Sequence, residues 1–180
     1  AKAVRGVLDL GDRQTRLIIF AEDTPLLVRT TGTGGRSWTQ RISDALRVTF
    51  RNAEVHKRTH GICRTGPACA SPGEGDDRSE LPAMLLGELR LDLTELAAEV
   101  KRSFEYVLGC HPSRQAGDLM LVGGGALLRN LPGYLGQALG IEVAPASTYA
   151  QEPDAGIRFP TSMRDPIELF ALAAGLAVGE

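Results

Sequence analysis

Apolar and polar residues alternate along the first part of the chain in three short segments. Apolar and β-branched side chains dominate each segment, and polar turns at residues 11–14 and 22–24 separate them. Alternation with a period of two is typical of strands that bury one face. The pattern therefore predicts a three-stranded meander over residues 4–10, 15–21 and 25–31.

The spacing of apolar residues lengthens after the meander and predicts two helices. The first covers residues 37–48, and we expect its apolar face to pack on the sheet. That face comprises Trp38, Ile42, Ala45 and Leu46. The second covers residues 50–60, where Glu54 and Lys57 lie three residues apart and therefore on one face. The plain structural alternative for this pair is an exposed ion pair, which contributes roughly a few tenths of a kcal/mol.

A long amphipathic helix is predicted over residues 81–108. Pro82 suits its first turn, and Gly109 suits its end. Its apolar stripe comprises Leu89, Leu93, Leu96, Val100, Phe104 and Val107. Residues 61–79, which precede it, are dense in Gly, Pro, Ser and charge, so they predict an excursion loop or a reduced inserted subdomain.

The run DLMLVGGGALLRNLPGYLGQALG at residues 118–140 predicts a strand, a glycine turn and a helix. Residues 119–122 are apolar over the length of a strand, and leucines follow at helical spacing from Ala126. Three glycines lie between them, Gly123, Gly124 and Gly125. Without Cβ atoms there, a ligand can lie against the backbone beside the amides that open the helix. Such a turn suits a nucleotide, although any α/β protein can turn from strand to helix on glycine.

The remainder of the chain predicts a short strand over residues 141–144 and a polar, proline-containing loop over residues 145–164. Residues 166–178 are apolar on nearly all sides, which favours a buried closing helix. A helix that binds a membrane surface is usually amphipathic, so a helix that is apolar on nearly all sides argues against direct membrane insertion.

Composition narrows the class of protein. The chain has 180 residues, 43% of them hydrophobic, which is enough for one domain with a proper core over residues 1–180. A formal charge of -2 without a basic block gives no electrostatic footprint for nucleic acid. The sequence shows neither a membrane-spanning run nor a signal peptide, so we expect a cytoplasmic protein. A start at Ala1, close to a strand, is what a fragment of a longer protein would show.

Two common nucleotide signatures do not fit. The glycines at residues 123–125 are contiguous and lack the spacing of a dinucleotide-binding fingerprint, and the chain contains no Gly-Lys pair for a P-loop. A bound nucleotide would therefore be held in another way.

The order of the motifs resembles the second lobe of an actin-like ATPase. The matching pieces are Asp9-Leu10-Gly11 with Thr15, Ala53-Glu54 with Lys57, Gly123-Gly124-Gly125-Ala126, and Ala174-Gly175-Leu176-Ala177. Within that superfamily the chain is most similar to the PilM family of type IV pilus assembly proteins, with FtsA as the nearest relative. The resemblance implies an α/β, ribonuclease H-like domain, with a mixed sheet, an N-terminal three-stranded meander and flanking helices.

The resemblance also implies a site for ATP and Mg²⁺. Asp9 matches the family's aspartate that holds magnesium, commonly through water. One carboxylate is enough for this purpose, because Mg²⁺ keeps much of its water shell and needs few protein ligands. Gly11 would let the turn approach the phosphates, and Asp12, Arg13 and Gln14 would line it through backbone amides. Thr15 matches the family's hydroxyl at the end of the turn. Its structural alternative is a turn-capping threonine.

The later motifs would hold the nucleoside. Glu54 and Lys57 match the family's charged pair against the ribose and base. Gly123, Gly124, Gly125 and Ala126 match the loop that passes over the adenosine.

The implied function is that of an adenine-nucleotide-binding cytoplasmic scaffold of the pilus machine. Its partner in the family is the inner-membrane protein PilN, whose peptide is expected to dock on the first lobe, and a homo-oligomer is also compatible. Phosphoryl transfer needs positioning from both lobes, so the second lobe alone should hydrolyse ATP poorly or not at all. Residues 61–79 are short for a subdomain that makes polymer contacts, which puts filament formation in doubt.

Other functions remain open on the sequence. His56, His60, Cys63 and Cys69 lie in one short window, and two histidines four residues apart can chelate zinc. Their alternative is incidental His and Cys in a reduced loop, where the compartment disfavours a disulfide. Sugar and acetate kinases and heat-shock ATPases share the half-cleft. An FtsA-like cell-division role and a scaffold without nucleotide complete the alternatives.

Overall fold

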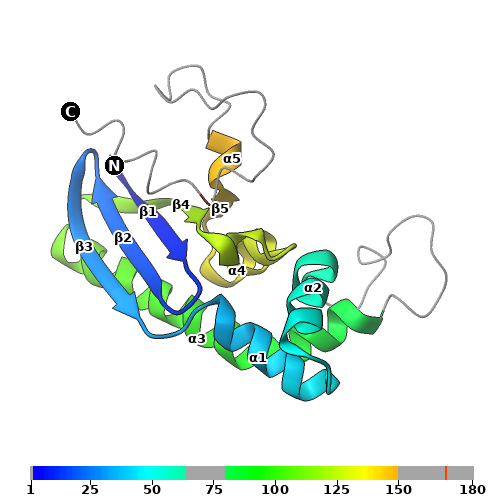
Figure 1. Cartoon of the computed structure of the whole chain (residues 1–180). Coiled ribbons are helices and arrows are strands. Elements are labelled where there is room, and N and C mark those ends of the chain that lie inside the picture. The colour runs from blue at the N-terminus through cyan, green and yellow to red at the C-terminus, as the bar shows by residue number, and fades with distance from the viewer. Residues whose placement is uncertain (1, 64–79, 150–168, 170–180) are drawn as a thin grey trace.

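A computed structural model describes residues 2–63, 80–149 and 169 of the chain. The described residues form a mixed α/β domain in which helices flank one sheet (Figure 1). The strands are β1 (Lys2–Leu10), β2 (Thr15–Ala21), β3 (Thr24–Thr31), β4 (Arg114–Val122) and β5 (Glu142–Pro145). The helices are α1 (Gly35–Leu46), α2 (Phe50–His60), α3 (Glu80–Cys110), the 3₁₀ helix η3 (Gly124–Leu127), α4 (Leu131–Leu139) and α5 (Ala146–Tyr149).

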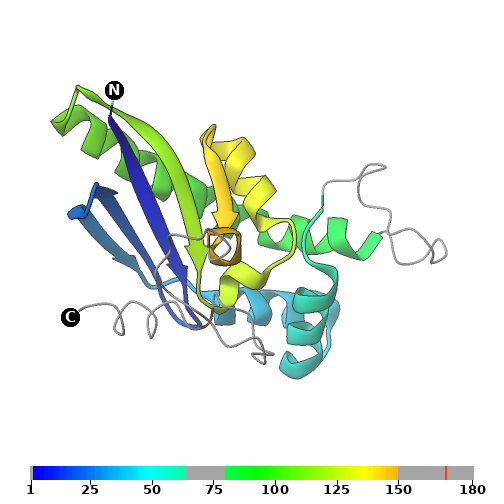
Figure 2. The ribbon, with the colours of Figure 1, turned by 90° about the horizontal axis from the view of Figure 1, so that it is seen from above.

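The sheet has the strand order β3-β2-β1-β4-β5 (Figure 2). β1, β2 and β3 are antiparallel neighbours, which confirms the predicted meander. β4 pairs with β1 in parallel, with Asp9 level with Val122, and β5 pairs with β4 in parallel. Because parallel strands end on the same side of a sheet, the residues that follow β1 and β4 meet at one edge.

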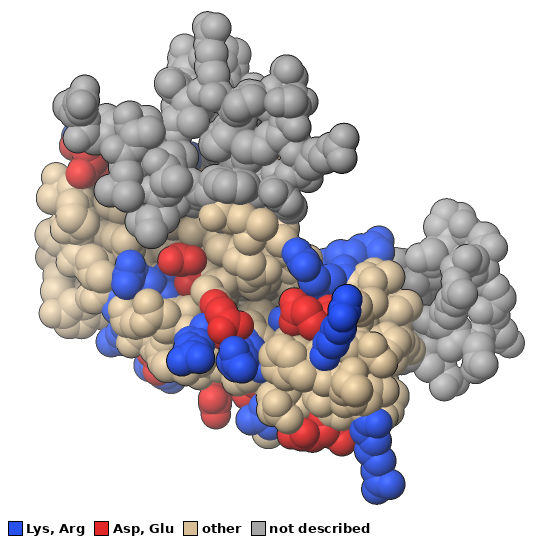
Figure 3. Space-filling view, in the orientation of Figure 1, with Lys and Arg blue, Asp and Glu red and all other residues tan. Residues whose placement is uncertain are grey.

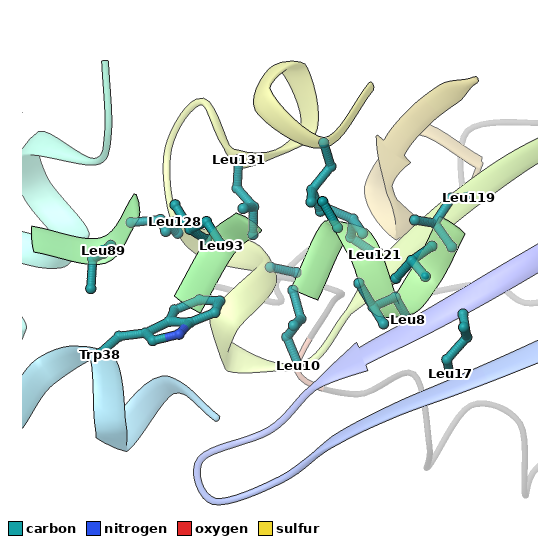
Figure 4. Close-up of a cluster of buried hydrophobic side chains, with 14 of the residues drawn as sticks. Leu8, Leu10, Leu17, Trp38, Leu89, Leu93, Leu119, Leu121, Leu128 and Leu131 are labelled. Carbon is teal, nitrogen blue, oxygen red and sulfur yellow. The ribbon is translucent and has the colours of Figure 1, made fainter. Parts of the chain in front are cut away.

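The long helix α3 buries its apolar stripe against one face of this sheet. Alternate residues of β2 from Thr15 to Ala21 are buried, as a strand with one covered face requires. Figure 4 shows Trp38 of α1 lying near Leu89 and Leu93 of α3, with leucines of β1 and β4 continuing the same core. The predicted stripe of α3 is buried at Leu89, Leu93, Val100, Phe104 and Val107, while Leu96 is partly buried.

The prediction that the helix after the glycines begins at Ala126 is wrong. Residues 124–127 form a 3₁₀ turn instead, and Asn130 adopts a left-handed conformation with φ of 68° before α4 begins at Leu131. Pro132 explains the difference, because proline lacks an amide hydrogen and clashes within a helix but fits its first turn.

Smaller differences concern α1 and the chain after β5. Ala45 is exposed, because the buried face of α1 is centred on Trp38, Thr39 and Ile42. The predicted loop from residue 145 contains the last residue of β5 and then α5. All of the predicted helix at residues 166–178 except Leu169, and most of the excursion at residues 61–79, lie outside the described residues. Among the helices that the structure describes, none combines the length and apolar character needed to cross a bilayer.

Candidate nucleotide site

The candidate site is the sheet edge where β1 and β4 end. We call residues 11–14 the β1–β2 turn and residues 123–126 the glycine loop. The two strands bring Asp9 beside the glycine loop, and a Cβ atom built on Gly123 would lie 2.5 Å from an oxygen of the Asp9 carboxylate and 2.7 Å from the Leu10 carbonyl oxygen. Gly123 has φ of 82°, a conformation that residues with side chains rarely adopt. Glycine is therefore required here both by conformation and by the approach of Asp9.

The Asp9 carboxylate fits a hydrated magnesium ion. Its side chain is partly buried, and within the described residues no hydrogen bond or ion pair engages it. A carboxylate without a protein partner at the carboxyl ends of parallel strands is in the usual position for a ligand of an open α/β sheet. Mg²⁺ keeps several waters and needs few protein ligands. The structure thus places Asp9 suitably for this role, which stays a prediction.

The β1–β2 turn offers backbone donors next to Asp9. The Gly11 amide donates to the Gln14 carbonyl at 3.0 Å, which closes the turn. Among the described residues, no backbone carbonyl accepts from the amides of Asp12 or Arg13. Successive free amides in a turn form a concavity that suits an anion. The Arg13 side chain is 80% exposed and lies 3.9 Å from the Asp12 carboxylate, so it is free to move toward a ligand.

The Thr15 side chain bonds within the protein, but it does not cap the β1–β2 turn. The residue is buried, and its hydroxyl donates to the Thr33 carbonyl at 2.7 Å. This bond ties the start of β2 to the segment before α1. Its predicted contact with a nucleotide is untested.

The turn is supported from below by the start of α1. The amides of Gly35 and Arg36 donate to the Gly11 and Asp12 carbonyls at 2.9 and 2.8 Å. A Cβ atom on Gly34 would lie 2.6 Å from the Asp12 carbonyl oxygen, so the turn rests directly on the helix. The first amides of α1 are therefore used by the turn itself and are not available to a ligand.

The pair of Glu54 and Lys57 is not an exposed ion pair. The Lys57 side chain is 8% exposed, and its Nζ lies 2.7 Å from Oε2 of Glu54. The same Nζ donates to the Gly35 carbonyl at 3.0 Å and to the Thr39 hydroxyl at 2.7 Å. Sequence spacing predicted the shared face, but not this burial, because the other acceptors come from α1.

Glu54 remains open to a ligand on one side. Its side chain is 37% exposed, and the bonds from Lys57 and Thr39 both go to Oε2. Burial alone raises the pKa of this carboxyl, but the hydrogen bonds from Lys57 and Thr39 and the charges of Lys57 and Arg58 outweigh it and lower the pKa below its ordinary value. The residue is therefore an anion near neutral pH, and Oε1 can accept a hydrogen bond.

The described residues hold no candidate metal cluster. No group of three or more His, Cys, Asp or Glu within them could hold a metal ion. His56 and His60 lie with ring centroids 5.7 Å apart, but Cys63 is disulfide-bonded, contrary to the expectation of a reduced loop. Cys69 lies outside the described residues. Cys63 therefore offers no thiolate as a ligand for the zinc site considered from the sequence.

A hollow of about 430 Å³ lies beside the β1–β2 turn. Its lining consists of Asp12, Arg13, Gly32, Gly34, Arg36, Ser37 and Gln40. The lining comes from the β1–β2 turn, the segment between β3 and α1, and α1 itself, and it includes no residue of the glycine loop. On the face shown in Figure 3, basic and acidic side chains are interspersed.

The comparisons with known proteins point to one superfamily. The protein-family model described as cell division protein FtsA matches residues 6–175. A chain of the PilM-PilN type IV pilus biogenesis complex is 28% identical with a TM-score of 0.67, and the match covers 98% of the present chain and 45% of that one. No curated protein matches the sequence.

Two further solved structures share the fold at lower identity. MreB5 of Spiroplasma citri bound to AMPPNP is 16% identical with a TM-score of 0.65, and the match covers 99% of the present chain and 53% of MreB5. The ethanolamine utilization protein EutJ from Carboxydothermus hydrogenoformans is 18% identical with a TM-score of 0.56, over 80% of the present chain and 44% of EutJ. The chain thus spans about half the length of the solved proteins it matches.

Proposed function

Because the chain belongs to the FtsA cell-division protein family, within the actin-like ATPase superfamily, we propose that it binds an adenine nucleotide with Mg²⁺. The contact of Asp9 with Gly123 carries the proposal, since it brings an unpaired carboxylate and a side-chain-free loop together at one sheet edge. Asp9 holds Mg²⁺ through water, the β1–β2 turn binds the phosphates, and the glycine loop carries the adenosine. Glu54 accepts from a ribose hydroxyl through Oε1.

We further propose a PilM-like role as a cytoplasmic scaffold of a type IV pilus machine. Support comes from the match over 98% of the chain to a structure of the PilM-PilN complex. A PilN-type inner-membrane protein would be the partner of the whole protein and would hold it peripherally at the membrane. Hydrolysis by this chain alone would be slow, because phosphoryl transfer needs groups on both sides of the nucleotide.

Calorimetric titration of MgATP into the chain tests nucleotide binding. We expect saturable binding that Asp9→Asn weakens by about tenfold, since a charge-assisted contact to the hydrated metal is lost. Asp23→Asn is the matched control, because Asp23 is an exposed residue of the β2–β3 turn. Absence of binding at millimolar MgATP, or equal weakening by both variants, contradicts the proposed site.

Deletion of the gene separates the pilus role from an FtsA-like role in division. A strain without the protein should lose surface pili and keep normal cell length if the pilus role holds. Filamentous cells with intact pili would support the cell-division alternative instead. A titration of the full-length protein with a short peptide from a PilN-type protein of the same organism then tests the partner.

A further inference from the structure

All three N–H donors of the buried Lys57 ammonium are bound to acceptors within the protein. An ammonium group has three N–H donors. In Lys57 these meet three acceptors, the Gly35 carbonyl at 3.0 Å, the Thr39 hydroxyl at 2.7 Å and Oε2 of Glu54 at 2.7 Å. Only 6% of the residue is exposed. No donor remains for a ribose hydroxyl or a base, and a new bond to a ligand would require one of these three to break.

One of the three acceptors belongs to the residue that supports the β1–β2 turn. Gly35 accepts from Lys57 through its carbonyl and donates through its amide to the Gly11 carbonyl at 2.9 Å. A Cβ atom on Gly35 would lie 3.6 Å from both the Gly11 carbonyl oxygen and Nζ of Lys57. The turn, the start of α1 and Lys57 of α2 therefore form one continuous hydrogen-bonded chain.

The C-terminal end of α2, which carries Lys57 in its last turn, is also bound to the segment that follows the glycine loop. The Ile62 amide donates to the Arg129 carbonyl at 3.1 Å, and Nδ2 of Asn130 donates to the Ile62 carbonyl at 2.7 Å. The Arg129 guanidinium donates to the Thr59 carbonyl at 2.9 Å. Helix α2 thus holds both sides of the candidate site, the phosphate side through Lys57 and the nucleoside side through residues 129 and 130.

We propose that Lys57 is a positioning residue that fixes the β1–β2 turn for the phosphates of a nucleotide. It acts through Gly35 and does not itself contact ribose or base. This inference rests on the proposed function, and it makes a distinct prediction about ligand class. Loss of Lys57 should reduce binding of nucleoside phosphates by more than it reduces binding of the nucleoside, which loses only the support that Lys57 gives to Glu54.

The test compares MgATP with adenosine for Lys57→Met, with Arg58→Met as the matched control. Arg58 is the exposed neighbour of Lys57 on α2. Calorimetric or competition titration should show MgATP affinity lowered by roughly tenfold in Lys57→Met, because the charge-assisted bond to Gly35 is lost. Adenosine affinity should fall by clearly less, about threefold or under, since adenosine does not use the turn and loses only the support that Lys57 gives to Glu54. Arg58→Met should match the parent for both ligands.

A second pair of variants guards against misfolding of Lys57→Met. Thr39→Val removes the hydroxyl that orients the ammonium, whereas Thr39→Ser retains it. Thr39→Val should show the same selective loss of MgATP binding, and Thr39→Ser should restore it. Circular dichroism establishes that each variant is folded before its affinities are compared.

Amide hydrogen exchange of the protein without ligand gives an independent readout. Gly35 and Arg36 should exchange faster in Lys57→Met by about tenfold, because their bonds to the turn lose support. Equal losses of MgATP and adenosine affinity would make Lys57 a nucleoside ligand and overturn the inference, as would unchanged affinities with unchanged exchange. If the parent binds neither ligand, the proposed function fails, and the exchange data alone then decide whether Lys57 holds the turn.

Discussion

The Asp9 carboxylate lies directly against Gly123, so that a single Cβ atom at position 123 would come within 2.5 Å of its oxygen. The two residues are far apart in sequence, and the parallel pairing of β1 with β4 brings them together. One is the candidate magnesium ligand, and the other begins the loop proposed to carry the adenosine. The geometry of the site therefore depends on the absence of a side chain at residue 123.

Gly123→Ala should destabilise the protein and displace Asp9. The new methyl group meets Asp9 and the Leu10 carbonyl, and alanine is strained at φ of 82°. We expect a loss of about 2 kcal/mol or more in the free energy of unfolding, together with weaker MgATP binding. Urea denaturation and calorimetric titration measure the two effects.

Gly133→Ala is the matched control for that substitution. Gly133 lies within α4, and a Cβ atom there would have no neighbour within 4 Å. Alanine should raise the free energy of unfolding by about 0.5–1 kcal/mol, because it has the higher helix propensity. A Gly123→Ala protein as stable as Gly133→Ala would show that the close approach of Asp9 is not maintained in solution.

Glu54 should make the stability of the protein depend on pH in the acid range. Its pKa is lowered from the ordinary 4.5 in the folded state. As pH falls the unfolded chain therefore binds the proton first, so the stabilisation is fully present above the unfolded pKa and is lost as pH falls through the folded one. Glu54→Gln should reduce the free energy of unfolding at pH 7, and the deficit should shrink toward pH 3.

The difference between the parent and Glu54→Gln is the quantity to measure, by urea denaturation at each pH. The pKa values of Glu22 and Glu99 are also lowered, by hydrogen bonds from Lys2 and Arg102 respectively, so the parent loses stability in acid for other reasons as well. These contributions cancel in the difference. A deficit that stays constant between pH 7 and pH 3 would mean that the Glu54 charge has no special interaction in the folded state.

Two leucines of α3 allow the core to be tested within one helix. Leu93 is fully buried beneath the sheet, whereas Leu91 is 65% exposed. Leu93→Ala should lower the free energy of unfolding by about 2–5 kcal/mol through lost burial and a cavity, and Leu91→Ala by about 0.5 kcal/mol or less. Similar losses for the two variants would place the wrong face of α3 against the sheet.

The sequence was sufficient for elements whose signals are local. The bounds of α2 agree with the prediction for residues 50–60, because Thr49 caps its first turn and Gly61 ends it with φ of 68°. The meander was likewise predictable from alternation and polar turns. The α/β, actin-like fold is confirmed by the sheet and by its likeness to the PilM-PilN and MreB5 structures.

Features that depend on distant partners could not be predicted from spacing. Lys57 is buried because Gly35 and Thr39 of another helix supply its acceptors, and nothing in the order of Glu54 and Lys57 indicates that. The delayed start of α4 did have a local signal in Pro132, which the leucine spacing obscured. The binding roles of Asp9, Gly11, Arg13, Thr15, Glu54, Lys57, Gly123, Gly124, Gly125 and Ala126 remain predictions.

Asn130 contributes both a left-handed backbone conformation and a side-chain hydrogen bond, and two substitutions can separate these contributions. Its backbone has φ of 68°, and its side-chain amide donates to the Ile62 carbonyl at 2.7 Å, beyond the end of α2. Asn130→Gly loses the hydrogen bond but tolerates the backbone conformation, so it should cost about 0.5–1.5 kcal/mol of unfolding free energy.

Asn130→Ala loses the bond and also strains the backbone, which adds about 1–2 kcal/mol. Urea denaturation of both variants therefore gives the backbone and hydrogen-bond contributions by difference, with the exposed Gln40 of α1 changed to Ala as a control. If α2 holds the segment after the glycine loop, both Asn130 variants should also speed amide exchange at Ile62, whose amide donates to the neighbouring Arg129 carbonyl. Unchanged exchange at Ile62 in both would mean that the loop and α2 are independent, and the link between α2 and the nucleoside side of the site would fail.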